Sequence, residues 1–428
     1  MLHLNQATPA QLREWEEALH NQYQAVAKAG LNLDLTRGKP NGEQLALSDA
    51  LDGILAGKYI DRDGTDLRNY GGLDGIPEAK ELFAPIAGVK PEEVMIGGNS
   101  SLTLMYFAAQ AALLHGVSDS SSAWQNEGRT IKFLAPVPGY DRHFTVCQHL
   151  GIELIPVAMD ENGPDMDQVE QLLQADSAIK GMWCVPRFSN PSGIVYSDAV
   201  VKRIANLGNI AGDNFRVFWD NAYAVHTLNP DAPMLANIMD YCREAGTADS
   251  VLIFGSTSKI TFAGAGVAFI AGSVANLEVL KKHFSFSSIG PDKINQLRHV
   301  AFLKNQETIS EHMAKHAAIM KPRFDAVLNL LKSELGDAGM GTWNEPEGGY
   351  FISFDALPGL AKKIVELAAA VGVKLTPAGA TFPYGKDPQD CNIRLSPTYP
   401  SVEDVKKTAE VFVLCVKLAS VRQALEQA

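Results

Sequence analysis

The chain has 428 residues, more than one domain usually contains, and its 46% hydrophobic and 20% charged residues predict two domains around a large apolar core. The formal net charge is -12 and there is no long basic cluster, so the composition argues against nucleic acid as a partner. No run reaches the roughly 18 apolar residues of a membrane span, so we expect no membrane partner either.

The amino-terminal segment has a helical pattern from Thr8 to Ala29, and it lacks the apolar core of a signal peptide. Five cysteines are scattered along the chain without a Cys-x-x-Cys pair. This usage favours a reducing compartment and offers no set of metal ligands. We therefore expect a cytoplasmic protein without a metal.

From about residue 90 to residue 275, short apolar runs alternate with helical patterns. The expected strands are Ile131–Pro136, Ile152–Val157, Met182–Val185, Val217–Asp220, Val251–Gly255 and Val267–Ala271. This alternation predicts an α/β fold with a mainly parallel sheet and helices on both faces. Chemistry is then expected at the carboxyl ends of the strands.

A long helical pattern from about Ile309 to Leu335 is followed by a glycine-rich stretch and, later, by the strand-like run from Cys391 to Ser396. These features predict a smaller α+β domain, which the amino-terminal helix completes. We expect residues 50–315 to form the large domain, and residues 1–49 together with 316–428 to form the small one.

Three polar motifs each follow an expected strand. Asn190 stands before a proline, Asp220 ends a strand three residues before Tyr223, and the hydroxyl-rich turn from Gly255 ends on Lys259. A lysine there can form an imine, a carboxylate can keep a pyridine nitrogen protonated, and a phenol or an amide can hydrogen-bond a ring oxygen. Taken singly, each motif is also typical of an ordinary turn or helix cap.

In this order, the motifs resemble those of the pyridoxal-phosphate-dependent aminotransferases of fold type I, and the resemblance covers most of the chain. It implies pyridoxal 5'-phosphate as cofactor, a large domain with a mainly parallel sheet of the seven-stranded type, and a smaller α+β domain. The runs from Leu33 to Pro40 and from Gly290 to Gln296 suggest the subgroup-1c aspartate aminotransferases. That subgroup is related to the aminotransferase half of certain fused transcription regulators.

The resemblance also implies a role for individual residues in holding the cofactor. Lys259 would carry it as an imine and act as the base, Asp220 would keep the pyridine nitrogen protonated, and Tyr223 would contact the ring's 3-oxygen. Further contacts to the ring or to the phosphate are implied for Asn190, Tyr140, Asn99, Ser100, Ser101, Ser256, Ser258 and Tyr70, the last from the second subunit of a homodimer. The phosphate would lie at the positive end of the helix that is expected to begin after Asn99.

Two of these assignments have ordinary alternatives, and one position departs from the family pattern. Asn99 and the serines after it fit a helix cap without a ligand, and Tyr70 fits a buried aromatic in a glycine-rich loop. Val267 stands where relatives commonly have a phosphate-binding arginine. We expect Lys293, from the second subunit, or Arg298 to replace that charge.

For the substrate, Arg394 lies where the family binds the α-carboxylate, a task that suits the planar guanidinium. Gly38 resembles the glycine whose backbone lies against the substrate, although a simple turn glycine is the alternative. A distal carboxylate needs a second arginine, and the candidates are Arg37, which is counted in the predicted site, Arg142, Arg187 and Arg298.

The expected reaction is amino transfer from L-aspartate or L-glutamate to a 2-oxo acid by a ping-pong mechanism. The alternatives are aromatic or small neutral amino acids as substrates, or a β-lyase or decarboxylase reaction on the same fold. A regulator that senses the cofactor is a non-enzymatic alternative. Because the chain starts almost directly with its first helix and lacks a basic DNA-binding segment, we expect an enzyme.

Overall fold

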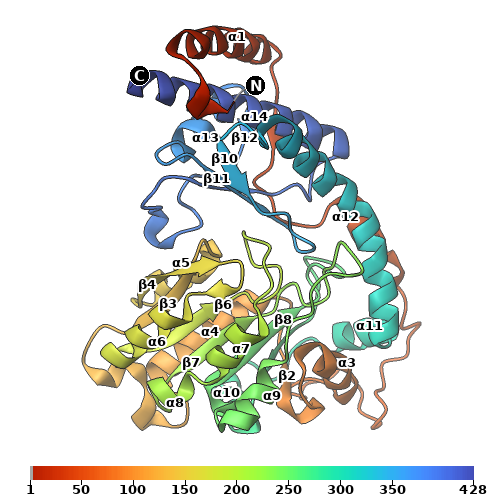
Figure 1. Ribbon diagram of the computed structural model, residues 1–428. Helices are drawn as coiled ribbons and strands as arrows, with labels where there is room; N and C mark the ends of the chain where they lie inside the picture. Colours follow the sequence, from red (N-terminus) through yellow and green to blue (C-terminus); the bar gives the residue numbers. More distant parts are fainter. Residues whose placement is uncertain (1–2) are drawn as a thin grey trace.

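The computed structural model describes residues 3–428, which form two lobes. A large sheet and its helices make up the lower lobe in Figure 1, and two small sheets with α1, α13 and α14 make up the upper lobe. Helix α12 (Gln306–Leu335) runs along one side from the lower lobe to the upper one (Figure 1). Because α12 is continuous across residue 316, the domain boundaries proposed from the sequence stay a prediction.

The large sheet has eight strands and is mainly parallel. In spatial order they are β2 (Val94–Ile96), β9 (Ala268–Ala271), β8 (Val251–Ser256), β7 (Arg216–Asp220), β6 (Ile179–Cys184), β3 (Lys132–Val137), β4 (Glu153–Asp160) and β5 (Gly163–Pro164). The five strands from β8 to β4 are parallel, whereas β9 is antiparallel to both of its neighbours. This confirms the expected α/β fold. The eighth strand is the two-residue β5, which pairs with the edge strand β4.

Both faces of this sheet are buried, as expected of parallel strands. Along β7, Val217 and Trp219 belong to one apolar cluster and Phe218 to the other, because successive side chains of a strand point to opposite faces. The covering helices are α3 (Pro77–Ala87), α4 (Ser101–His115), α5 (Asp141–His149), α6 (Met166–Ala175), α7 (Asp198–Ala205), α8 (Gly208–Ala211), α9 (Ile238–Ala245), α10 (Val274–Phe284) and α11 (Lys293–Leu303).

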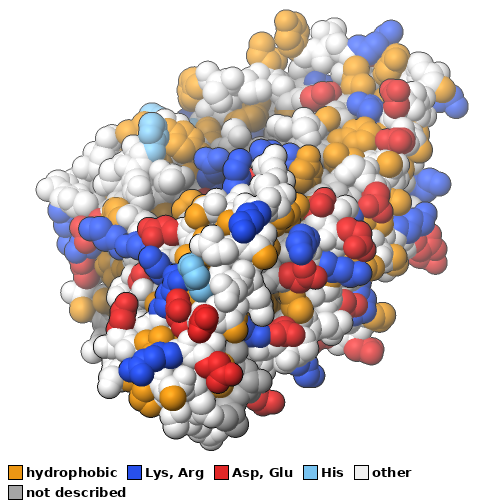
Figure 2. All heavy atoms as spheres, turned by 90° about the horizontal axis from the view of Figure 1, so that it is seen from above, with side chains coloured by type: hydrophobic (Ala, Val, Ile, Leu, Met, Phe, Trp, Pro, Cys, Tyr) orange, Lys and Arg blue, Asp and Glu red, His pale blue; other side chains and the backbone are white. Residues whose placement is uncertain are grey.

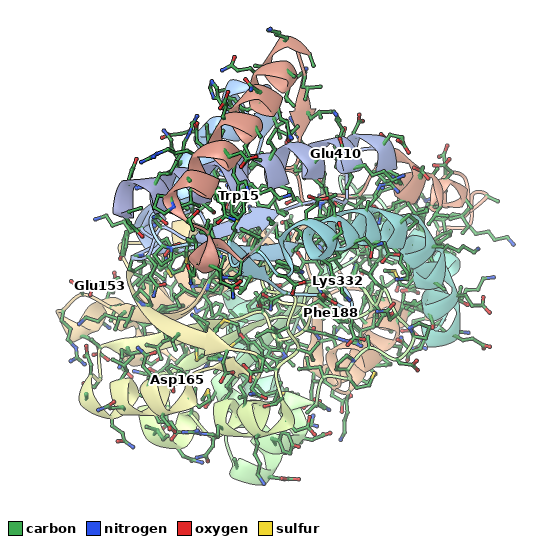
Figure 3. The ribbon with its side chains drawn as sticks, turned by 45° about the horizontal axis from the view of Figure 1, so that its top comes forward. Trp15, Glu153, Asp165, Phe188, Lys332 and Glu410 are labelled. Atoms are coloured by element: carbon green, nitrogen blue, oxygen red, sulfur yellow. The ribbon has the colours of Figure 1, made fainter. Side chains whose placement is uncertain are left out.

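The upper lobe is an α+β unit built from both ends of the chain. Its strands are β1 (Leu33–Asp34), β10 (Gly341–Trp343), β11 (Ile352–Ala356), β12 (Val373–Lys374) and β13 (Asn392–Leu395), and its helices besides α12 are α1 (Pro9–Lys28), α2 (Gly42–Ala46), α13 (Ala361–Ala370) and α14 (Val402–Gln427). Trp15 on α1 packs against the core of this lobe, and Phe188, from the loop after β6, belongs to that core. Figure 3 labels both residues. A loop of the large sheet therefore shares the core of the upper lobe.

Acidic and basic side chains are interspersed on the face that Figure 2 shows. Within residues 3–428, no helix is both long and apolar enough to cross a membrane. The same residues contain no group of three or more His, Cys, Asp or Glu side chains that could hold a metal ion. All five cysteines are free thiols.

Candidate active site

A cavity of about 200 Å³ lies where the strands of the large sheet end at their carboxyl termini. It brings together ten of the residues that the sequence pointed to: Gly38, Ser100, Ser101, Tyr140, Asn190, Asp220, Tyr223, Ser256, Ser258 and Lys259. The remaining lining residues are mainly apolar: Leu102, Met105, Val185, Ala222 and Phe351. Segments far apart in the sequence therefore meet at one edge of the sheet, as the strand-end argument requires.

Asp220 ends β7 and is only 2% exposed. Its Oδ2 lies 2.9 Å from Nε2 of His143, whose ring stacks on Trp183 with ring centroids 4.3 Å apart. Its Oδ1 is buried and has no hydrogen-bond partner within residues 3–428. Because an unpaired buried carboxylate oxygen is costly, this atom is suited to accept a hydrogen bond from an N–H or O–H group of a ligand in the cavity.

Lys259 lies in the turn after β8, which two hydrogen bonds close. The Thr257 amide donates to the Val267 carbonyl at 2.8 Å, and the Val267 amide donates to Oγ1 of Thr257 at 2.9 Å. Lys259 Nζ lies 5.0 Å from the ring centroid of Tyr223. Burial lowers the pKa of the Lys259 ammonium, and the charge of Asp220 opposes that shift. A lowered pKa increases the share of neutral amine, which is the nucleophilic form.

The backbone next to Lys259 is held by two buried histidines of α12. Nε2 of His312 and Nε2 of His316 lie 2.7 Å and 2.9 Å from the carbonyl oxygen of Ile260. Gln44 accepts the Asn41 amide with Oε1, so its Nε2 faces Nδ1 of His316 at 3.1 Å. Nδ1 of His316 is therefore the acceptor and Nε2 carries the proton, which donates to Ile260.

The hydroxyl groups of the cavity gather at the amino terminus of α4. Ser100, the residue before the helix, makes no capping hydrogen bond with its side chain. The first amides of α4 lack intrahelical partners, as in any α-helix. Ser258 approaches from the lysine turn, and its Oγ donates to the Asn99 carbonyl at 3.0 Å. The Asn99 side chain instead donates to the Gly264 carbonyl at 3.3 Å and does not line the cavity.

Arg394, on β13, does not line the cavity itself but contacts Asn190 and Phe351, which do. Its Nη1 lies 3.0 Å from Oδ1 of Asp141 and 3.3 Å from Oδ1 of Asn190, whereas its buried Nε has no partner in the described part of the chain. The guanidinium lies 4.9 Å from the ring centroid of Phe351. A Cβ on Gly38 would lie 2.2 Å from Phe351 Cζ, so Gly38 allows this close approach. Asn190 and Asp141 thus orient a partly free guanidinium.

The family model described as aspartate amino-transferase matches residues 7–428. The chain belongs to this aminotransferase family. A putative aminotransferase of Mycolicibacterium smegmatis is 45% identical over 412 residues, with 96% of each chain covered. The aspartate aminotransferase of Corynebacterium glutamicum is 43% identical over 407 residues, which covers 95% of this chain and 94% of that one. The crystal structure of an aspartate transaminase from Corynebacterium glutamicum superposes with a TM-score of 0.95 at 41% identity and covers 99% of both chains.

Three residues of this aminotransferase that were predicted to contact a phosphate lie outside the cavity of the single chain. Tyr70 is 82% exposed and lies outside the cavity, and Lys293 is buried with its Nζ 2.6 Å from the Gly71 carbonyl. Arg298 donates from Nε to the Leu51 carbonyl at 3.1 Å. Within a single chain, none of these groups lines the cavity. Their roles in phosphate binding stay predictions.

The four arginines considered for a distal carboxylate lie in different surroundings. Arg37 is exposed, with Nε 3.5 Å from a carboxylate oxygen of Asp34, and Arg187 faces a different cavity of the aminotransferase. Arg298 is bound to the backbone, as described above. Arg142 is exposed, forms no ion pair within residues 3–428, and is close enough to lower the pKa of Tyr140 against a larger upward shift caused by burial.

Sequence reasoning missed several residues that hold this site. His143 is three residues after Tyr140, which is a helical spacing that could have indicated a shared face. His312 and His316 have the same kind of signal, an i, i+4 pair on one helix. Nothing in the sequence indicates that Gln44 contacts His316, because 272 positions separate them.

Proposed function

We propose that this aminotransferase depends on pyridoxal 5'-phosphate and moves an amino group between L-aspartate or L-glutamate and a 2-oxo acid. The observation that carries the proposal is that the unpartnered Oδ1 of Asp220 and the lysine with a lowered pKa belong to one cavity. The relatives named aspartate aminotransferase support the choice of substrate.

The residues of the cavity fit this cofactor. A pyridine N–H would satisfy Oδ1 of Asp220, which otherwise has no partner within residues 3–428. Tyr140 and Ala222 line the cavity and would lie against the ring. The amino terminus of α4 with Ser100 and Ser258 offers the amides and hydroxyls that a phosphate prefers.

Bound pyridoxal phosphate would act as an electron sink for charge that develops at the substrate's α-carbon. Arg394 would bind the α-carboxylate with its free Nε edge and so orient the α-hydrogen. Lys259 would take that proton on Nζ and return it later in the cycle, because its lowered pKa keeps part of the amine neutral. Asp220, fixed by His143, would hold a proton at the pyridine nitrogen.

We propose Arg142, in preference to Arg37, for the distal carboxylate of the substrate. The other three candidates are already engaged. Arg37 pairs with Asp34, Arg298 donates to a backbone carbonyl, and Arg187 lies in another cavity. A charge-assisted contact of this kind contributes about 1.5–3 kcal/mol, which corresponds to roughly 10- to 100-fold in KM. Arg142→Gln should therefore raise KM for aspartate and leave alanine unaffected. The matched control Arg13→Gln, at another exposed arginine, should change neither.

We also propose a homodimer in which Tyr70 of one chain reaches the phosphate site of the other. Tyr70 is 82% exposed, and Phe286 and Ile289, on a loop that contacts the same glycine-rich segment, are 81% and 63% exposed. Apolar side chains this exposed and this close together fit a subunit interface. Sedimentation should show a dimer, and Tyr70→Ala should weaken cofactor retention. A stable monomer that keeps its cofactor would exclude this arrangement.

The absorption spectrum tests the proposed function. L-aspartate should abolish the absorption band of the bound cofactor, and 2-oxoglutarate should restore it. Lys259→Ala should show neither change. A band that aspartate leaves intact would redirect the substrate assignment to aromatic or small neutral amino acids. Release of pyruvate or ammonia without an amino acceptor would indicate a lyase instead.

A further inference from the structure

A second cavity, of about 290 Å³, lies across strand β7 from the active site. Asp220 lines the first cavity, whereas Trp219 and Asn221 on either side of it line the second. Successive side chains of a strand point to opposite faces, so the two cavities share one wall. Beyond the strand, Tyr223 lines the active site and Ala224 lines the second cavity.

The second cavity contains a buried cation without a counter-ion. Arg187 is 8% exposed, and no carboxylate of residues 3–428 forms an ion pair with it. Its Nη atoms donate to the carbonyls of Ala224 and Pro233, and its guanidinium lies 5.0 Å from the ring centroid of Phe188. Its Nε is buried with no partner among the described residues. Burial lowers the pKa of the guanidinium. Charges in such surroundings are normally paired.

A second polar atom of the same cavity also lacks a partner. Oδ1 of Asn221 is buried and accepts no hydrogen bond from any described residue. The lining of the cavity therefore includes both a planar cationic donor, Arg187, and a free acceptor, Asn221. Buried polar groups are rarely left unpaired, so two in one cavity point to a ligand.

We propose that this cavity binds a small carboxylate that also carries a hydroxyl or amino group, such as a hydroxy acid or an amino acid. The carboxylate pairs with Arg187, whose guanidinium fork matches its two oxygens. The hydroxyl or amino group donates to Oδ1 of Asn221. No residue of the catalytic cavity takes part, so the site is separate from the one described above.

The position of this site couples it to the active site. In the segment from Trp219 to Ala224, every residue lines one of the two cavities: residues 219, 221 and 224 line the second cavity, and the other three, Asp220 and Tyr223 among them, line the active site. A ligand that fixes Asn221 and Arg187 also restrains this segment. Any effect on cofactor or substrate binding must then be reciprocal, because coupling between two binding sites acts equally in both directions.

Calorimetric titration with glycolate tests the proposal on the holoenzyme. Glycolate has one carboxylate and one hydroxyl, and it could also bind Arg394, so the titration uses the Arg394→Gln variant as background. We expect one glycolate per chain in this background. Adding Arg187→Met should weaken binding at least tenfold, and acetate, which lacks the hydroxyl, should bind more weakly than glycolate.

A matched control is Arg13→Gln in the same background, which should leave glycolate binding unchanged. If Arg187→Met fails to fold, Asn221→Leu replaces it and should weaken glycolate relative to acetate. The proposal is overturned if the Arg394→Gln enzyme does not bind glycolate, which would mean that water alone fills the cavity. It is equally overturned if the Arg187→Met and Asn221→Leu enzymes bind glycolate as tightly as their background does.

Discussion

His316 should make the protein sensitive to acid, and His316→Gln should remove a measurable part of that sensitivity. Burial is the main reason why the pKa of His316 falls from 6.5 to about 4, and the neighbouring His312 adds to the shift. As the pH falls below 6.5, the unfolded chain binds a proton that the folded protein does not. The contribution to stability is therefore fully present above pH 6.5 and is lost as the pH falls toward 4.

The size of this effect follows from the two pKa values. Between pH 7 and pH 5, a histidine with a pKa of about 4 when folded and 6.5 when unfolded loses about 2 kcal/mol of stability. A glutamine at this position can still donate to the Ile260 carbonyl and accept from Gln44, but it cannot titrate. At pH 7 we expect the variant to be within about 1 kcal/mol of the wild type, since both hydrogen bonds are retained.

Urea unfolding at pH 7, 6 and 5, followed by tryptophan fluorescence, measures the difference. The wild type should lose about 2 kcal/mol more than His316→Gln over this range. His226 and His312 also have lowered pKa values, so both proteins should become less stable and only their difference is diagnostic. His149→Gln, at an exposed histidine, should follow the wild type. Parallel pH profiles for the wild type and His316→Gln would refute the reasoning.

Three further predictions concern the cavity. Gly38→Ala should lower the unfolding free energy by about 1–3 kcal/mol in urea and raise KM for aspartate, because the new Cβ would displace the Phe351 ring from Arg394. His143→Phe should weaken cofactor affinity about tenfold in a fluorescence titration, since Asp220 would lose the partner that fixes it; unchanged affinity would argue against that role. In urea unfolding of the cofactor-free protein, the unfolding free energy of the wild type relative to Lys259→Met should increase as the pH rises toward 10.5, because the lowered pKa of Lys259 means that the unfolded chain binds a proton that the folded chain does not; parallel pH profiles would argue against this contribution.

The central part of the site could be predicted from the sequence because strand ends carry local signals. Asp220 comes directly after an apolar run, and Lys259 follows another apolar run after one short turn. Parallel strands end at the same edge of a sheet, so the two residues had to be close once both runs were recognised as strands. The register pairs Asp220 with Phe254, five residues before the lysine. The same argument brought Asn190 to this edge.

The rest of the site depends on contacts that leave no local signal. Arg187 comes three residues after a strand and three residues before Asn190, so the sequence allows it to face either cavity. Only packing decides that it lines the second cavity and not the one that Asn190 lines. Asp141 pairs with Arg394 across 253 positions. Such pairs are decided by how the two lobes meet, which neither periodicity nor turn chemistry contains.

Val267 explains why the lysine turn would offer no arginine to the phosphate of the proposed cofactor. Its side chain is 2% exposed and packs in the core, and its backbone closes the lysine turn through Thr257. An arginine at this position would be buried in apolar surroundings, which is costly without a partner. Lys293 has one of its three N–H groups on the Gly71 carbonyl, next to the exposed Tyr70, and so keeps two donors for another group. If a second chain brings Tyr70 to the phosphate, Lys293, at the start of α11, comes with it through its contact with Gly71. The cation missing from the lysine turn would then come from the partner, and cofactor affinity would depend on dimer formation.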